Sequence, residues 1–201
     1  MGKTMNRKAL IIDVESTCWE TPNEQPAGQT SEIIEIGIAV VNIDKRVIEA
    51  NDTILVKPQM SKVSQFCTKL TTLTQEQVDT GVTFQEAMSL LKKKYNSSNS
   101  LFVSWGDYDR KMFERNCQDY GVKYPFGPRH MNLKNTFAVL HGLERELGMD
   151  AALFAYNLKI EGTHHRGIDD AKNIAKIFID LVGIYRAGVG LFNLKIPSSA
   201  E

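Results

Sequence analysis

The sequence predicts an α/β fold in which a mixed β-sheet of about five strands is flanked by α-helices. Two observations indicate it. Three strand-like segments follow one another early in the chain, as in an antiparallel meander, and later strand-like segments alternate with helical ones, as parallel strands do. The chain has 201 residues, 42% of them hydrophobic, and no linker-like stretch. We therefore expect one domain over 1–201, with a core at about 8–186 and a tail at 187–201.

The strands are predicted from short apolar runs bounded by turn residues. The first is continuous and rich in Ile, as in a strand buried on both faces. Asp44 and Lys45 indicate a hairpin turn between the second and third strands. Strands are expected at 8–14, 32–42, 46–57, 101–105 and near 130–134.

The helices are predicted from apolar residues at helical spacing. Phe84, Ala87, Met88, Leu91 and Tyr95 recur in this way and mark an amphipathic helix. Helices are expected at 83–95, 109–120, 135–147, 151–158 and 168–186, with a further helix start at Thr74.

Composition and cysteine spacing restrict the class of protein. Cys18, Cys67 and Cys117 are far apart and form no C-x-x-C, which argues against a disulfide framework and a structural zinc site. No signal region or membrane-length apolar segment is present, so we expect an intracellular, cytoplasmic protein without membrane contact. The formal net charge of zero neither indicates nor excludes nucleic acid binding.

Two acids stand at the end of the first strand, in A-L-I-I-D-V-E-S-T-C. Side chains alternate along a strand, so Asp13 and Glu15 point to the same face. Two like charges at a core strand need a cation between them, which could be Lys, Arg or a metal, and hard oxygen ligands suit Mg²⁺ or Mn²⁺. The alternative is an exposed strand end with two solvated acids.

The fourth strand leads into W-G-D-Y-D-R-K-M-F, which offers two more acids. In a helix starting here, Asp109 shares a face with Met112 and Phe113, whereas Asp107 shares one with charged residues. Asp109 is therefore expected to face inward, and Asp107 to face solvent or cap the helix. The alternative is that both are simply acids at a helix start.

The last helix opens with H-H-R-G-I-D-D-A-K-N-I-A and repeats the pattern. Asp170 shares a face with Ile174 and is expected inward, whereas Asp169 is a first-turn acid that suits the helix dipole. His164 and His165 each precede one of these acids by five residues, so spacing alone does not select the histidine.

Four inward carboxylates cannot share one pocket without cations. Two divalent ions about 4 Å apart would neutralise them and form the clamp used in phosphodiester cleavage. A neutral histidine could then take the proton from the attacking water. The acids are Asp13, Glu15, Asp109 and Asp170.

These motifs resemble those of the DEDDh group of 3′→5′ exonucleases, which have a ribonuclease-H-like fold, and in particular its Eri-type exoribonuclease branch. The resemblance covers about residues 8–186. It rests on D-V-E-S-T-C, E-I-I-E-I-G, F-C-T-K-L-T-T-L-T-Q-E-Q-V, G-D-Y-D-R-K-M-F and H-R-G-I-D-D-A-K-N-I-A. The last motif has its histidine five residues before the acid, which selects His165 and Asp170.

The resemblance implies a metal-dependent 3′→5′ exonuclease that hydrolyses single-stranded 3′ ends or short overhangs to nucleoside 5′-monophosphates. It assigns two Mg²⁺ ions, replaceable by Mn²⁺, to the four acids, and the role of general base to His165. It also implies substrate contacts. The backbone of Thr17 would meet the terminal 3′-hydroxyl, Phe66 and Tyr108 would stack on bases unless they pack in the core, and Leu70 would wedge between bases. Trp105 is expected in the core.

Other functions remain open at this point. RNA is favoured over DNA, and a DNA 3′→5′ exonuclease is the nearest alternative. A non-catalytic nucleic-acid-binding module and a hydrolase of small phosphoesters are further alternatives. Some relatives carry an additional RNA-binding module ahead of the nuclease, whereas about seven residues precede the first strand here, so we expect a protein partner to supply specificity. The oligomeric state is open.

Overall fold

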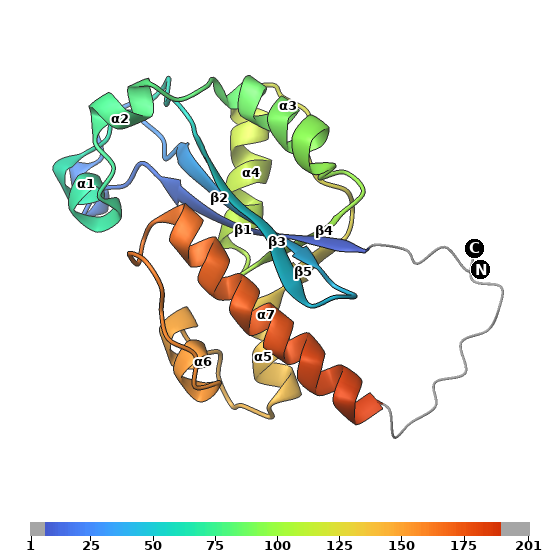
Figure 1. Ribbon diagram of the computed structural model, residues 1–201. Helices are drawn as coiled ribbons and strands as arrows, with labels where there is room; N and C mark the ends of the chain where they lie inside the picture. Colours follow the sequence, from blue (N-terminus) through green and yellow to red (C-terminus); the bar gives the residue numbers. More distant parts are fainter. Residues whose placement is uncertain (1–6, 190–201) are drawn as a thin grey trace.

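The computed structural model describes residues 7–189 of the chain (Figure 1). The predicted tail at 187–201 lies outside the described residues except for 187–189, which continue the last helix. In the described part of the chain, no helix is both long enough and apolar enough to cross a membrane.

The sheet has five strands, as the sequence predicted, and their order is β3-β2-β1-β4-β5. β1 is antiparallel to β2, and β2 is antiparallel to β3. β4 is parallel to β1, and β5 is parallel to β4. The strands are β1 (Lys8–Ser16), β2 (Ile33–Asn42), β3 (Val47–Leu55), β4 (Leu101–Ser104) and β5 (His130–Asn132). β1 is thus the central strand.

Helices cover both faces of this sheet (Figure 1). α3 and α4 lie on one face, and α5, α6 and α7 lie on the other. α1 and α2 lie beyond the end of β1 (Figure 1). The helices are α1 (Gln65–Thr71), α2 (Gln75–Asp79), α3 (Phe84–Tyr95), α4 (Tyr108–Asp119), α5 (Leu133–Leu140), α6 (Met149–Ala155) and α7 (Gly167–Val189), with a short 3-10 helix, η1, at Pro22–Glu24.

The alternation of β1 explains why it can be buried on both sides. Leu10 and Ile12 belong to the core beneath α3 and α4. Ala9 and Ile11 belong to the core beneath α7 and its neighbours. The continuous apolar run of β1 therefore contributes side chains to both cores, as expected of a central strand that is buried on both faces. The carboxyl end of β1 is where the first two acids of the sequence emerge.

Several boundaries differ from those expected. Helix α1 was not expected from the sequence; it begins after Ser64, whose hydroxyl accepts a hydrogen bond from the Cys67 N–H. The helix expected at 135–147 ends at Leu140. Gly142 stops it, because this glycine adopts a left-handed conformation with φ of 63° just after the end of the helix. The helix expected at 151–158 ends at Ala155.

Candidate active site

Four acids from three elements line one cavity of about 330 Å³. Asp13 and Glu15 come from the end of β1, Asp109 from the first turn of α4, and Asp170 from the first turn of α7. β4 runs parallel to β1, so the helix that follows β4 begins beside the carboxyl end of β1. The sheet topology thus gathers acids that lie far apart in the sequence.

The inward orientation of two acids is confirmed. Asp109 and Asp170 are both buried, each with 4% exposure. Asp107 instead faces outward and lies 3.6 Å from an Arg110 nitrogen in an ion pair. Asp169 accepts a hydrogen bond of 2.9 Å from the Thr163 N–H in the loop before α7. The helical spacing of apolar residues therefore distinguished the acids correctly at both helix starts.

The donor set fits a divalent metal. One carboxylate oxygen each from Asp13, Glu15 and Asp170 lies within 4.8 Å of the others. The fourth carboxylate, Asp109, lines the same cavity and accepts a hydrogen bond of 2.9 Å from the Val14 N–H. Buried carboxylate oxygens at this spacing are the hard ligands that Mg²⁺ and Mn²⁺ prefer.

The electrostatics of the cluster also favour a cation. Burial, followed by repulsion from Asp109 and Glu15, raises the pKa of Asp13 well above its ordinary value. Burial and then the charge of Asp170 raise the pKa of Glu15 to about 8. Burial raises the pKa of Asp109 to about 7. Carboxylates that hold protons near neutral pH would release them to a bound divalent ion.

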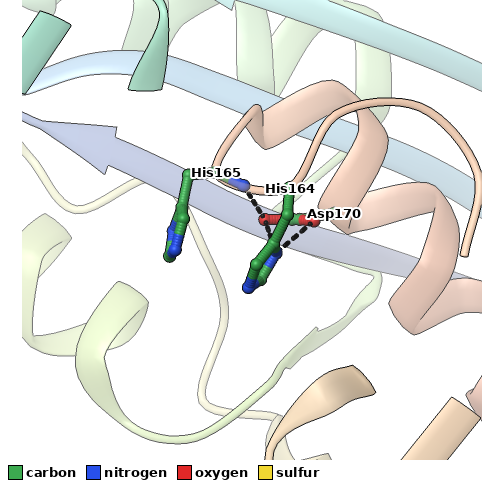
Figure 2. Close-up of side chains that lie close together, drawn as sticks. All are labelled: His164, His165 and Asp170. Carbon is green, nitrogen blue, oxygen red and sulfur yellow. Dashed lines mark hydrogen bonds and ion pairs between the residues drawn. The ribbon is translucent and has the colours of Figure 1, made fainter. Parts of the chain in front are cut away.

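Two adjacent histidines, His164 and His165, line the same cavity as the acids (Figure 2). The His164 Nδ1 lies 3.2 Å from each carboxylate oxygen of Asp170. The backbone N–H of His165 donates to Asp170 Oδ2 at 2.9 Å. The two rings extend from the loop in the same direction and stack with centroids 4.0 Å apart. Asp170 thus holds one histidine by its ring and the other by its backbone.

The two imidazoles differ in their surroundings. Burial, reinforced by the charge of His164, lowers the pKa of His165, which favours a neutral ring at pH 7. His165 also has a φ of 64°, a left-handed conformation uncommon for residues other than glycine. Among the described residues, none forms a hydrogen bond with the His165 ring. Its nitrogens are therefore open to the cavity, whereas one His164 nitrogen is engaged.

The residues expected to touch substrate are divided by the structure. Leu70 and Tyr108 line the cavity, and the exposed Tyr108 shares a hydrogen bond of 2.7 Å with the Ser16 hydroxyl. Phe66 lines a neighbouring hollow of about 420 Å³, which shares Leu70 with the main cavity. Trp105, expected in the core, packs against the core and also lines the cavity.

Thr17 lies outside the cavity and is fully buried. Its N–H donates to the Glu32 carbonyl at 2.8 Å. Its hydroxyl accepts from the Glu32 N–H at 2.9 Å and shares a hydrogen bond of 2.8 Å with the Ser61 hydroxyl. These contacts join the segment after β1 to the segment that leads into α1. The Thr17 hydroxyl is therefore occupied by bonds within the protein.

Sequence reasoning missed one charged pair beside the site, formed by Glu35 of β2 and Arg166. Glu35 is fully buried although it carries a carboxylate. The available signal was an acid inside the apolar run I-I-E-I-G-I-A-V-V, since such a group needs a partner. The partner itself is 131 residues away, beyond the reach of spacing arguments.

The sheet order, the covering helices and the clustered acids define a ribonuclease-H-like exonuclease. The exonuclease family model RNase_T matches residues 10–178, and the chain belongs to this family.

Among its relatives is KapD of Bacillus subtilis, a probable 3′-5′ exonuclease, with 31% identity over 169 residues, or 84% of this chain and 82% of KapD. Human 3′-5′ exoribonuclease 1 is 29% identical over 182 residues, or 86% of this chain but 51% of the human protein. Among solved structures, the nuclease domain of 3′hExo, a DEDDh family member bound to rAMP, superposes with a TM-score of 0.80 at 27% identity, covering 91% of this chain and 95% of that one.

Proposed function

We propose that this protein is a metal-dependent 3′→5′ exoribonuclease that releases nucleoside 5′-monophosphates from single-stranded ends or short overhangs. The observation that carries the proposal is the cavity in which four carboxylates from three elements meet two histidines. Membership in the exonuclease family supports the reaction class. The substrate class is supported by the relatives named as exoribonucleases and by the rAMP bound to 3′hExo.

The four acids would hold two divalent ions, Mg²⁺ or in its place Mn²⁺. Bound there, the ions supply Lewis-acid stabilisation of the charge that develops on the phosphate and on the leaving oxygen. Asp13, Glu15 and Asp170 are close enough to one another to share one ion. Asp109 completes the charge balance from the opposite helix, α4.

His165 would take the proton from the attacking water at a ring nitrogen. Its lowered pKa keeps the imidazole neutral near pH 7, as a general base requires. His164 would not act as the base, because its Nδ1 is engaged with Asp170. Leu70 and Tyr108 in the cavity wall would contact the terminal nucleotides, with Tyr108 offering its ring for stacking. Phe66, in the adjoining hollow, would contact the next base.

We further infer a reducing, cytoplasmic setting, which the three free thiols support. We expect a protein partner to select particular RNAs, because the cavity contacts proposed here are with features that every RNA end shares. The single exonuclease domain would supply cleavage, and the partner would supply recognition.

The test uses a 5′-labelled single-stranded RNA and the DNA of the same sequence, each with Mg²⁺ or with EDTA. We expect the RNA to shorten stepwise from its 3′ end only with Mg²⁺. Asp13→Asn serves as the inactive control that should still bind the RNA. Faster cleavage of DNA would reassign the substrate. Equal binding of RNA with and without Mg²⁺, with neither oligomer cleaved, would instead indicate a binding module.

A further inference from the structure

Glu35 is a buried carboxylate that the proposed reaction does not use. It lies on β2 directly across from Glu15 in the sheet, and its side chain is fully buried. A buried charge is stable only with partners that satisfy it. Oε1 accepts from the Thr53 hydroxyl at 2.9 Å and from Arg166 Nη2 at 3.2 Å. Oε2 accepts from Arg166 Nε at 3.2 Å and from the Gly167 N–H at 2.9 Å.

These four contacts show that Glu35 is not placed as a metal ligand. Each oxygen already accepts two hydrogen bonds, which uses the capacity of an ionised carboxylate. Binding an ion would require the loss of at least one of them. In the described part of the chain, two groups of side chains are close enough to hold a metal, one formed by Asp170 with Asp13 and Glu15 and one by Asp170 with His164 and His165, and Glu35 belongs to neither. Its contacts therefore serve the protein itself.

Besides Thr53, the partners of Glu35 are the two residues that follow His165 and lead into the helix carrying Asp170. Arg166 follows His165 directly, and Gly167 begins α7. The N–H groups of a first helical turn lack partners within the helix, and a carboxylate placed there also suits the helix dipole. Glu35 thus caps α7 from a neighbouring strand. At 3.4 Å, Arg166 Nη1 also donates to Thr72, the residue that ends α1.

The backbone of His165 is held from both sides by these contacts. Its left-handed conformation is unfavourable for a residue with a Cβ and persists only where neighbouring contacts fix it. On one side, the His165 N–H is held by Asp170 Oδ2. On the other, the next two residues are held by Glu35. The direction of the His165 ring follows from this backbone.

We infer that Glu35, acting through Arg166 and the Gly167 N–H, is a positioning residue that holds the His165 imidazole in the direction needed to meet the water over the acid cluster. This inference rests on the proposed exonuclease function and assigns Glu35 a role beyond that of the four acids. The ion pair of Glu35 and Arg166 joins β2 to the loop before α7. In this way it would fix the distance between the acids on β1 and the proposed base, His165.

The first test compares two substitutions on the same carboxylate network. Glu35→Gln keeps the shape of the side chain but turns an amide toward Arg166, which breaks the two-pronged contact. We expect kcat on single-stranded RNA to fall about 10–100-fold, the range found for residues that orient catalytic ligands, with KM changed less than about twofold. Thr53→Val is the matched control, because it removes one bond to Glu35 from β3 and leaves the contacts with the loop intact. It should keep a kcat near wild type.

A second readout is independent of activity. In metal-free protein, amide hydrogen exchange should quicken at His165 and Gly167 in Glu35→Gln and stay unchanged there in Thr53→Val. Arg166→Lys, which keeps the charge but loses the fork, should resemble Glu35→Gln in both measurements. It also provides the test if Glu35→Gln does not fold.

The last test asks whether Glu35 acts through the base. In a His165→Ala background, Glu35→Gln should cause almost no further loss of kcat. A full further loss, or a Glu35→Gln single variant with wild-type kcat and unchanged exchange, would overturn the inference. A wild-type protein that cleaves no oligonucleotide would overturn the proposed function instead. Amide exchange would then test whether Glu35 holds the His165 backbone. Equal protection in wild type and Glu35→Gln would show that it does not.

Discussion

Gly37 of β2 and Gly167 of α7 touch backbone to backbone. A Cβ placed on Gly37 would lie 1.8 Å from the carbonyl oxygen of Gly167, which is far inside contact distance. Gly37 is also the sheet partner of Asp13. The first turn of α7 therefore rests directly on β2 beside β1, the strand that carries the first two acids, and this contact brings Asp170 to them.

Gly37→Ala should disturb both stability and the site. The added methyl meets backbone, which cannot rotate away, so we expect a loss of about 1–3 kcal/mol in the free energy of unfolding. Displacement of α7 should also reduce RNA cleavage at temperatures where the variant is folded. Urea unfolding and a cleavage assay measure the two effects. Gly188→Ala is the control, because an added methyl there meets no described residue within 4 Å and should cause neither loss.

The two stacked histidines should respond unequally to substitution. His165→Ala removes the proposed base and should lower kcat about 10²–10⁴-fold. His164→Ala removes only a ring that contacts Asp170 and stacks on His165, so we expect a much smaller loss. Steady-state kinetics of both variants with saturating Mg²⁺ decide the matter. A larger loss in His164→Ala would transfer the role of base to His164.

Metal-free protein should lose stability as pH rises. The folded pKa of Glu15 is about 8 and that of Asp109 about 7, both above the ordinary values of about 4 for such groups. The folded state then retains protons that the unfolded state releases, so the free energy of unfolding falls between about pH 4 and pH 8. Thermal unfolding in EDTA should show this decline. Mg²⁺ should raise Tm more at pH 8 than at pH 5.5.

A control separates the acid cluster from other titrating groups. Burial lowers the pKa of His130, which works in the opposite direction, because stability is gained as pH rises toward the ordinary histidine value. Glu15→Gln should therefore flatten the decline seen in EDTA and leave the His130 contribution unchanged. A Tm in EDTA that is constant or rises from pH 5.5 to pH 8 in wild-type protein would contradict the expectation.

Thr17 should prove structural when its hydroxyl is removed. Thr17→Val leaves the buried Glu32 N–H without its acceptor, so we expect a cost of about 1–3 kcal/mol in the free energy of unfolding. Thr17→Ser keeps the hydroxyl and should stay near wild type. Chemical unfolding measures both, and KM for RNA should be unchanged in each. Unchanged stability with a raised KM in Thr17→Val would show instead that the hydroxyl serves substrate binding.

The sequence was sufficient where local patterns determine the structure. The inward positions of Asp109 and Asp170 followed from helical spacing, because apolar neighbours on the same face have to reach the core. The mixed sheet, antiparallel first and then parallel, followed from the succession of elements. Long-range pairs were out of reach. Nothing near Glu35 in the chain indicates Arg166, and nothing near Thr17 indicates that Glu32 and Ser61 occupy its hydroxyl.

The order in which the site's parts occur along the chain has a consequence for synthesis. Asp13 and Glu15 leave the ribosome first, Asp109 follows, and His165 and Asp170 come with α7, the last described helix. Chains are made from the N-terminus at about 5–20 residues per second. A growing chain therefore lacks Asp170 and the proposed base, His165, until α7 has been made. The proposed cleavage of RNA would therefore become possible only after α7 has emerged.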